Sequence, residues 1–314
     1  MKRVLLICAA LACAAGATSA SAQTVTRSIK GVVAEATPVE LVKDGFKAVE
    51  GPLPQPDGGL LFGDNQSSQI VRIAPDLTVS AWFENSGGAN ALTRMPNGDI
   101  VATLVGDKVI AVMKPGSPPQ PLVSGYNGTP FNRPNDLVAS RRGDIYFTDT
   151  AAPGAAGAAL PSAVYQLSEQ GVLTRITTDI ARPNGVALSP DDDTLYVANT
   201  AGDHIIAFDL DRKGRPGKHR DFAQLAMPTS QAGAPASSGA DGIAVDAEGR
   251  LFVATTLGVQ VFSSRGKALG TIDLPKTPQN LAFAGPGRTW LYVVGRGAVF
   301  RISTLTHGTD REGK

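Results

Sequence analysis

Short apolar runs alternate with turn residues along most of the chain, and one order of features recurs six times. Each unit starts with a polar residue beside a short apolar strand, passes a turn rich in Gly, Asp or Asn, and enters a second apolar strand. The polar residues that start the units, called the anchors below, are Glu50, Asn90, Asn135, Asn184, Asp241 and Asn280. They lie 40, 45, 49, 57 and 39 residues apart, which suits four short strands with their turns.

This repeat predicts an all-β fold, a six-bladed β-propeller with four-stranded blades around a central channel. We expect one propeller domain over residues 23–314, with blades from about 31 to 305. Residues 31–49 contain strand-like stretches and should supply the outer strand of the last blade, which closes the ring and hides its edges. An up-and-down barrel or a sandwich is the alternative, but neither predicts an anchor at the start of every unit.

The first residues form a signal for export. A short basic start is followed by 13 apolar or small residues over 4–16, and Ala20-Ser21-Ala22 supplies a small-x-small cleavage site. We therefore expect a signal peptide over 1–22 and a protein that is periplasmic or secreted after cleavage near Ala22. A buried N-terminal helix is the alternative. Both cysteines, Cys8 and Cys13, fall in the removed segment, so no disulfide is expected.

Composition excludes two classes of partner. Lys and Arg together number 29 and Asp and Glu 28, with no basic block, which argues against nucleic-acid binding. No later segment approaches 18 consecutive apolar residues, so no membrane span is expected. We expect a monomer that acts on a small molecule.

The anchors predict a metal site. The innermost strands of a propeller begin around one mouth of the channel, so the six anchors should converge there. All six are oxygen donors and none is His or Cys, which suits a hard cation. We expect one divalent cation, Ca²⁺ first, with Mg²⁺, Mn²⁺ or Zn²⁺ as alternatives. The competing interpretation is that Asn and Asp before Gly simply form turns.

Four motifs resemble the SMP-30/gluconolactonase/LRE-like family of six-bladed propellers, in order and over residues 45–302. They are Glu50-Gly51-Pro52, Arg133-Pro134-Asn135-Asp136, Arg182-Pro183-Asn184-Gly185-Val186 and Ala240-Asp241-Gly242-Ile243. The resemblance implies that Glu50, Asn184 and Asp241 bind the metal and that Asn135 ligates it or contacts substrate. It also implies that Arg133 holds substrate oxygen atoms. Asp241 matches the family's general base or, in phosphotriesterase-like members, its nucleophile.

The resemblance implies a divalent-metal-dependent hydrolase that opens a lactone or related small ester. The metal would polarise the carbonyl and Asp241 would act as general base. The alternative is a non-catalytic ligand-binding propeller with a structural Ca²⁺ in its channel. A strictosidine-synthase-like propeller is a third hypothesis, and it would not require the complete set of Glu50, Asn184 and Asp241.

Two long loops should lie over the anchors, at residues 151–163 and 227–239. Both are rich in Ala, Gly, Ser and Pro and carry no charge, so each is either a lid or an unstructured insertion. In the sugar-lactone members that the chain resembles, the first of these loops carries charged residues that contact sugar hydroxyls. Its lack of charge here favours a less polar or bulkier lactone or ester.

Overall fold

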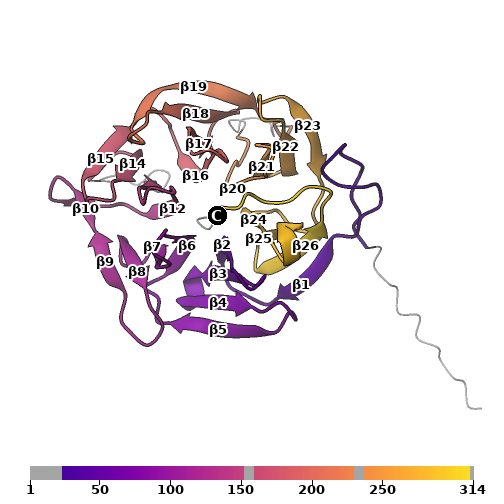
Figure 1. Cartoon of the computed structure of the whole chain (residues 1–314), viewed down its shortest axis with the longest axis horizontal. Helices are drawn as coiled ribbons and strands as arrows, with labels where there is room; N and C mark the ends of the chain where they lie inside the picture. Colours follow the sequence, from indigo (N-terminus) through magenta and orange to yellow (C-terminus); the bar gives the residue numbers. More distant parts are fainter. Residues whose placement is uncertain (1–22, 152–158, 230–236, 312–314) are drawn as a thin grey trace, which may run out of the picture.

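The computed structural model describes residues 23–151, 159–229 and 237–311, and these form a closed ring of six four-stranded antiparallel sheets (Figure 1). The predicted six-bladed propeller is confirmed. The expected signal peptide over 1–22 lies outside the described residues. In the described part of the chain, no helix is long and apolar enough to cross a membrane.

Five blades are built from four consecutive strands each, with the first strand innermost (Figure 1). The first blade contains β2 (Val49–Pro54), β3 (Leu60–Asp64), β4 (Gln69–Ile73) and β5 (Val79–Glu84). The second contains β6 (Ala89–Arg94), β7 (Ile100–Leu104), β8 (Val109–Met113) and β9 (Gln120–Val123). The third contains β12 (Pro134–Ala139), β13 (Ile145–Asp149), β14 (Ala163–Leu167) and β15 (Leu173–Thr177).

The remaining elements follow the same plan. The fourth blade contains β16 (Pro183–Leu188), β17 (Thr194–Asn199), β18 (His204–Leu210) and β19 (Pro216–Gln224). The fifth contains β20 (Ile243–Val245), β21 (Leu251–Thr255), β22 (Gly258–Phe262) and β23 (Ala268–Ile272). A small hairpin and two 3₁₀ turns complete the described connections, namely β10 (Gly125–Tyr126), β11 (Thr129–Pro130), η1 (Asn65–Ser67) and η2 (Pro286–Arg288).

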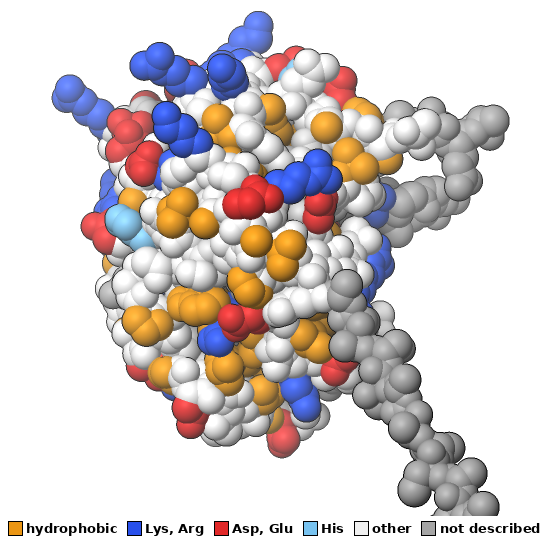
Figure 2. All heavy atoms as spheres, turned by 90° about the vertical axis from the view of Figure 1, so that its right-hand side faces the viewer, with side chains coloured by type: hydrophobic (Ala, Val, Ile, Leu, Met, Phe, Trp, Pro, Cys, Tyr) orange, Lys and Arg blue, Asp and Glu red, His pale blue; other side chains and the backbone are white. Residues whose placement is uncertain are grey.

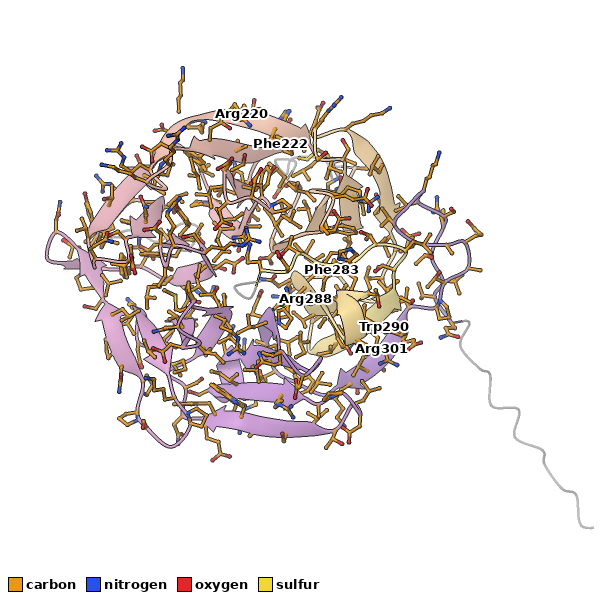
Figure 3. The ribbon with its side chains drawn as sticks, in the orientation of Figure 1. Arg220, Phe222, Phe283, Arg288, Trp290 and Arg301 are labelled. Atoms are coloured by element: carbon orange, nitrogen blue, oxygen red, sulfur yellow. The ribbon has the colours of Figure 1, made fainter. Side chains whose placement is uncertain are left out.

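The sixth blade closes the ring with a strand from the start of the chain. It contains β24 (Asn280–Ala284), β25 (Trp290–Gly295), β26 (Ala298–Ser303) and, outermost, β1 (Glu40–Asp44). Arg301 of β26 faces Glu40 of β1, and its Nε donates to the Glu40 carboxylate at 2.7 Å. The same guanidinium lies over the Trp290 ring, 4.3 Å from its centroid (Figure 3). The expectation that residues 31–49 supply the outer strand is confirmed.

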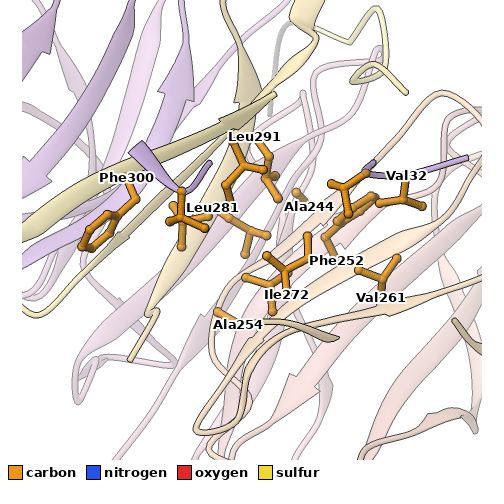
Figure 4. Packing of buried hydrophobic residues seen from close by; sticks show 14 of the residues in the cluster. Val32, Ala244, Phe252, Ala254, Val261, Ile272, Leu281, Leu291 and Phe300 are labelled. Carbon is orange, nitrogen blue, oxygen red and sulfur yellow. The ribbon is translucent and has the colours of Figure 1, made fainter. Parts of the chain in front are cut away.

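Apolar packing between neighbouring blades holds the ring together. Because each sheet is covered on both faces by other blades, its inner strands are buried along their whole length rather than on alternate residues. The largest cluster joins blades five and six, where Phe252 and Leu281 pack with Val32, which precedes β1 (Figure 4). On the face shown in Figure 2, charged groups of both signs are interspersed with small hydrophobic groups.

Residues 304–311, called the C-terminal strap below, cross the ring at the mouth opposite the anchors. Arg311 is 4% exposed and pairs with Asp192 in the β16–β17 turn of blade four. Arg288, near the middle of the ring in Figure 3, donates to the carbonyls of Thr309 and Arg311. The described part of the chain consequently ends near the ring centre (Figure 1). The sequence analysis did not foresee this strap.

Candidate active site

The six anchors stand at the starts of the innermost strands and surround one mouth of the channel, the anchor mouth. Direct contacts link them from blade to blade. The Glu50 carboxylate accepts hydrogen bonds from Asn280 Nδ2 at 3.3 Å and from the neighbouring Gln279 Nε2 at 3.0 Å. Asn90 Nδ2 donates to the Asn135 carbonyl at 3.0 Å.

Glycines let these strands approach so closely. Gly51, Gly185 and Gly242 directly follow Glu50, Asn184 and Asp241. A Cβ added at Gly185 would lie 2.1 Å from the Asp241 carbonyl oxygen, and one at Gly242 would lie 2.2 Å from Asn280 Cγ. Gly185 N instead donates to that carbonyl at 3.1 Å. The simple turn interpretation is therefore wrong for Asn184-Gly185, which lies inside β16, where the glycine serves contact between blades.

Asp241 is the electrostatic centre of the site. Burial raises the pKa of its carboxyl well above the ordinary value, and the negative charges of Glu50 and Asp136 raise it further. The guanidiniums of Arg182 and Arg296 act in the opposite direction. Glu50 and Asp136 are thus close enough for their charges to act on Asp241, and positive charge stabilises this arrangement.

Asp136 is the member of this group that sequence reasoning missed. It is fully buried, and its carboxylate accepts hydrogen bonds from Leu137 N at 2.9 Å and Val186 N at 3.1 Å. It therefore joins β12 to β16 and fixes the spacing of Asn135 and Asn184.

Asn184 offers the clearest opening for a cation. It is 8% exposed, its Nδ2 donates to Thr200 Oγ1 at 3.1 Å, and its Oδ1 is buried with no hydrogen-bond partner among the described residues. An unsatisfied buried oxygen costs about 1–3 kcal/mol. Together with the carboxylates of Glu50 and Asp241, this oxygen fits a hard divalent ion.

The side-chain oxygens of the other asparagine anchors differ in the hydrogen bonds that they accept. Asn90 Oδ1 accepts from Asn65 Nδ2 at 2.6 Å, and Asn280 Oδ1 accepts from Leu281 N at 2.9 Å. Among the described residues, Asn135 Oδ1 accepts a long contact of 3.4 Å from Asn90 Nδ2 and no shorter one. No three His, Cys, Asp or Glu side chains of residues 23–151, 159–229 and 237–311 group as metal ligands, so a site here depends on amide oxygens.

Arg133 lies at the anchor mouth with an exposed side chain. Its backbone N donates to Asp149 Oδ1 at 2.6 Å, which fixes the loop before Asn135. The arginines that lower the pKa of Asp241 are instead Arg182, one blade further along, and Arg296. Arg-Pro-Asn occurs at both places, so the repeat itself could have identified Arg182.

The described ends of both long loops reach the anchor mouth. Ser237 Oγ donates to the Thr200 carbonyl at 2.5 Å, and Ala151 N donates to Ser162 Oγ at 3.0 Å. Residues 152–158 and 230–236 lie outside the described residues, so the lid stays a prediction.

Residues 49–296 match the sequence profile of the SMP-30/gluconolactonase/LRE-like region. The chain belongs to this family. A gluconolactonase of Zymomonas mobilis is 32% identical over 303 residues, covering 87% of this chain and 83% of the relative. A lactonohydrolase of Aspergillus oryzae is 32% identical over 208 residues, covering 58% and 47% of the two chains.

Solved structures of other proteins show the same architecture. A gluconolactonase from Xanthomonas campestris is 28% identical, with a TM-score of 0.77 over 91% of this chain and 96% of that one. The calcium-binding protein regucalcin of Agrobacterium tumefaciens is 19% identical, with a TM-score of 0.73 over 88% and 97%. The regucalcin likeness concerns the fold alone.

Proposed function

We propose that this family member is a divalent-metal-dependent hydrolase that opens a lactone or related small ester. The lactonase class is supported by the relatives, two of which hydrolyse lactones by name and are 32% identical to this chain. The metal dependence is carried by one observation, the unpartnered Asn184 Oδ1 beside the Glu50 and Asp241 carboxylates.

Glu50, Asn184 and Asp241 would hold the cation, with Asn135 beside them. A divalent cation bound there supplies a Lewis acid for the lactone carbonyl and lowers the pKa of water. Gln279 and Asn280 keep the Glu50 carboxylate in place through their hydrogen bonds. Asp241 would accept the proton of the attacking water at a carboxylate oxygen.

Substrate orientation falls to Arg133 and Asn135. The exposed Arg133 guanidinium can hold a carbonyl or hydroxyl oxygen with two N–H groups, because its backbone is already fixed by Asp149. The Asn135 amide, held only weakly by Asn90, can turn toward substrate or cation. These roles follow the family resemblance.

Ca²⁺ is the ion we propose first, because the donor set contains only oxygen atoms and a structural relative is a calcium-binding protein. We also propose that the protein acts in the periplasm or outside the cell, and as a monomer. The proposed location rests on the export signal over 1–22.

Calorimetric titration with Ca²⁺ tests the metal site. The wild-type protein should bind one ion, and Glu50→Gln and Asn184→Leu should each weaken binding at least about tenfold, because each removes a ligand oxygen. Asn97→Leu is the matched control, since Asn97 is exposed in the β6–β7 turn at the opposite mouth. Equal affinity in wild type and Asn184→Leu would contradict the site. Ca²⁺ binding without lactone hydrolysis would favour the non-catalytic propeller.

A further inference from the structure

Two arginines flank Asp241 from the neighbouring blades, and the proposed reaction uses neither. Asp241 begins blade five, Arg182 precedes β16 of blade four, and Arg296 forms the β25–β26 turn of blade six. Both guanidiniums are close enough to Asp241 to oppose the rise of its pKa. The blades on the two sides of the candidate base therefore each supply a positive charge.

Backbone contacts fix both arginines to the site. Arg182 O accepts from Thr200 N at 3.0 Å, and the Thr200 hydroxyl in turn receives the Asn184 amide. Arg296 N donates to Gln279 Oε1 at 2.9 Å, and the same Gln279 side chain donates to Glu50. Each arginine is thus one hydrogen-bonded residue away from a candidate metal ligand.

Neither guanidinium forms a salt bridge among the described residues, and Arg182 Nε is buried with no hydrogen-bond partner among them. Buried N–H groups normally have an acceptor. The oxygen that this group lacks is one that a bound molecule can supply.

The sum of the charges at the site indicates the sign of the charge that such a bound molecule carries. Glu50, Asp136 and Asp241 contribute three negative charges, and a divalent cation would offset two of them. The two guanidiniums then leave one positive charge in excess, and the exposed Arg133 at the same mouth adds another. A negatively charged substrate would offset this excess of positive charge.

We propose that Arg182 and Arg296 bind a carboxylate of the substrate, so that the preferred lactone carries a carboxylate in addition to its ester group. This inference rests on the proposed function. A guanidinium binds a carboxylate with two parallel hydrogen bonds, which a lysine does not reproduce. The uncharged loop at 151–163 favours a less polar substrate, but most of that loop, residues 152–158, lies outside the described part of the structure. We therefore infer the charge of the substrate from the two arginines.

Two lactones that differ at one carbon test the inference. D-Glucaro-1,4-lactone carries a carboxylate where D-glucono-1,4-lactone carries a hydroxymethyl group. The wild-type protein with Ca²⁺ should favour the carboxylate lactone at least about tenfold in kcat/KM. Arg182→Gln and Arg296→Gln should each reduce that preference about tenfold through KM, and Arg182→Lys should recover part of it.

Arg265→Gln is the matched control, because it removes one positive charge from an exposed turn at the opposite mouth and should keep the preference. Equal losses on both lactones in Arg182→Gln, or no preference in wild type, would overturn the inference while leaving lactone hydrolysis intact. Calorimetry with D-gluconate and D-glucitol, which differ only in a carboxylate against a hydroxymethyl group, separates the two proposals. Tighter binding of gluconate that Arg182→Gln abolishes supports the carboxylate site even if no lactone is opened, and equal binding of the two overturns it.

Discussion

At the scale of single residues, Asp241 combines a candidate catalytic role with a cost in stability. Its pKa in the folded protein is raised above the ordinary value of 3.8, so the folded state retains the proton more strongly than the unfolded chain. The contribution of Asp241 to the free energy of unfolding is therefore most favourable below that ordinary value, and it is lost as the pH rises through the raised pKa. At neutral pH an ionised Asp241 opposes folding unless a cation is bound.

Asp241→Asn should accordingly melt at a higher temperature than wild type in chelator at pH 7, by about 2 °C or more, because it removes one of three crowded negative charges. The gain should shrink toward pH 4 and in saturating Ca²⁺, which stabilises the wild type by binding its folded state. Thermal unfolding followed by circular dichroism measures both effects. Asp221→Asn, at an exposed position in β19, is the control. A lower melting temperature for Asp241→Asn in chelator would contradict the electrostatic account.

The sequence predicted Glu50, Asn135, Asn184 and Asp241 as neighbours because the repeat places each at the same point of its blade. It did not predict Asp136 or Gln279. Their hydrogen-bond partners, Val186 and Glu50, lie 50 and 229 residues away along the chain. Such contacts depend on which blades become neighbours and on the direction of single side chains, and no local pattern records either.

At the scale of elements, different interactions determine the innermost strands and the C-terminal strap. Apolar runs and glycines in the sequence predict the strands, and the ring closure through β1 could be predicted from the same pattern. The strap has no apolar periodicity. It is held by the buried pair of Arg311 and Asp192, by Arg288, and by Ala247 N, which donates to the His307 carbonyl at 2.9 Å.

Arg311→Met should lower the free energy of unfolding by about 3 kcal/mol, because it removes the buried partner of Asp192 and leaves that carboxylate only its contacts with Arg141. Adding Asp192→Asn should recover part of that loss. Denaturant unfolding of the two variants and of Arg212→Met, an exposed arginine near the same mouth, provides the comparison. Unchanged stability in Arg311→Met would mean that the strap contributes little to the fold.

At the scale of the whole molecule, the two mouths of the channel are unlike. On the strap side, Gly308, Thr309 and Arg311 line a cavity of about 20 Å³ with the inner strands of blades three to six, and Asp310 and Arg311 line a more open one of about 210 Å³. The anchor mouth, in contrast, brings together carboxylates, an unpartnered amide oxygen and arginines. Substrate should therefore enter from the anchor mouth, and the strap side should serve the integrity of the ring.

The most direct test of this account is proton release during lactone opening, measured with Ca²⁺ and with chelator and corrected for spontaneous hydrolysis. A panel of sugar, acyl and aromatic lactones should include at least one that the wild-type protein opens only with the cation, and Asp241→Asn should lose that activity while remaining folded. Turnover that persists in chelator, or in Asp241→Asn, would contradict the metal-assisted mechanism. No turnover of any lactone despite tight Ca²⁺ binding would contradict the assigned reaction.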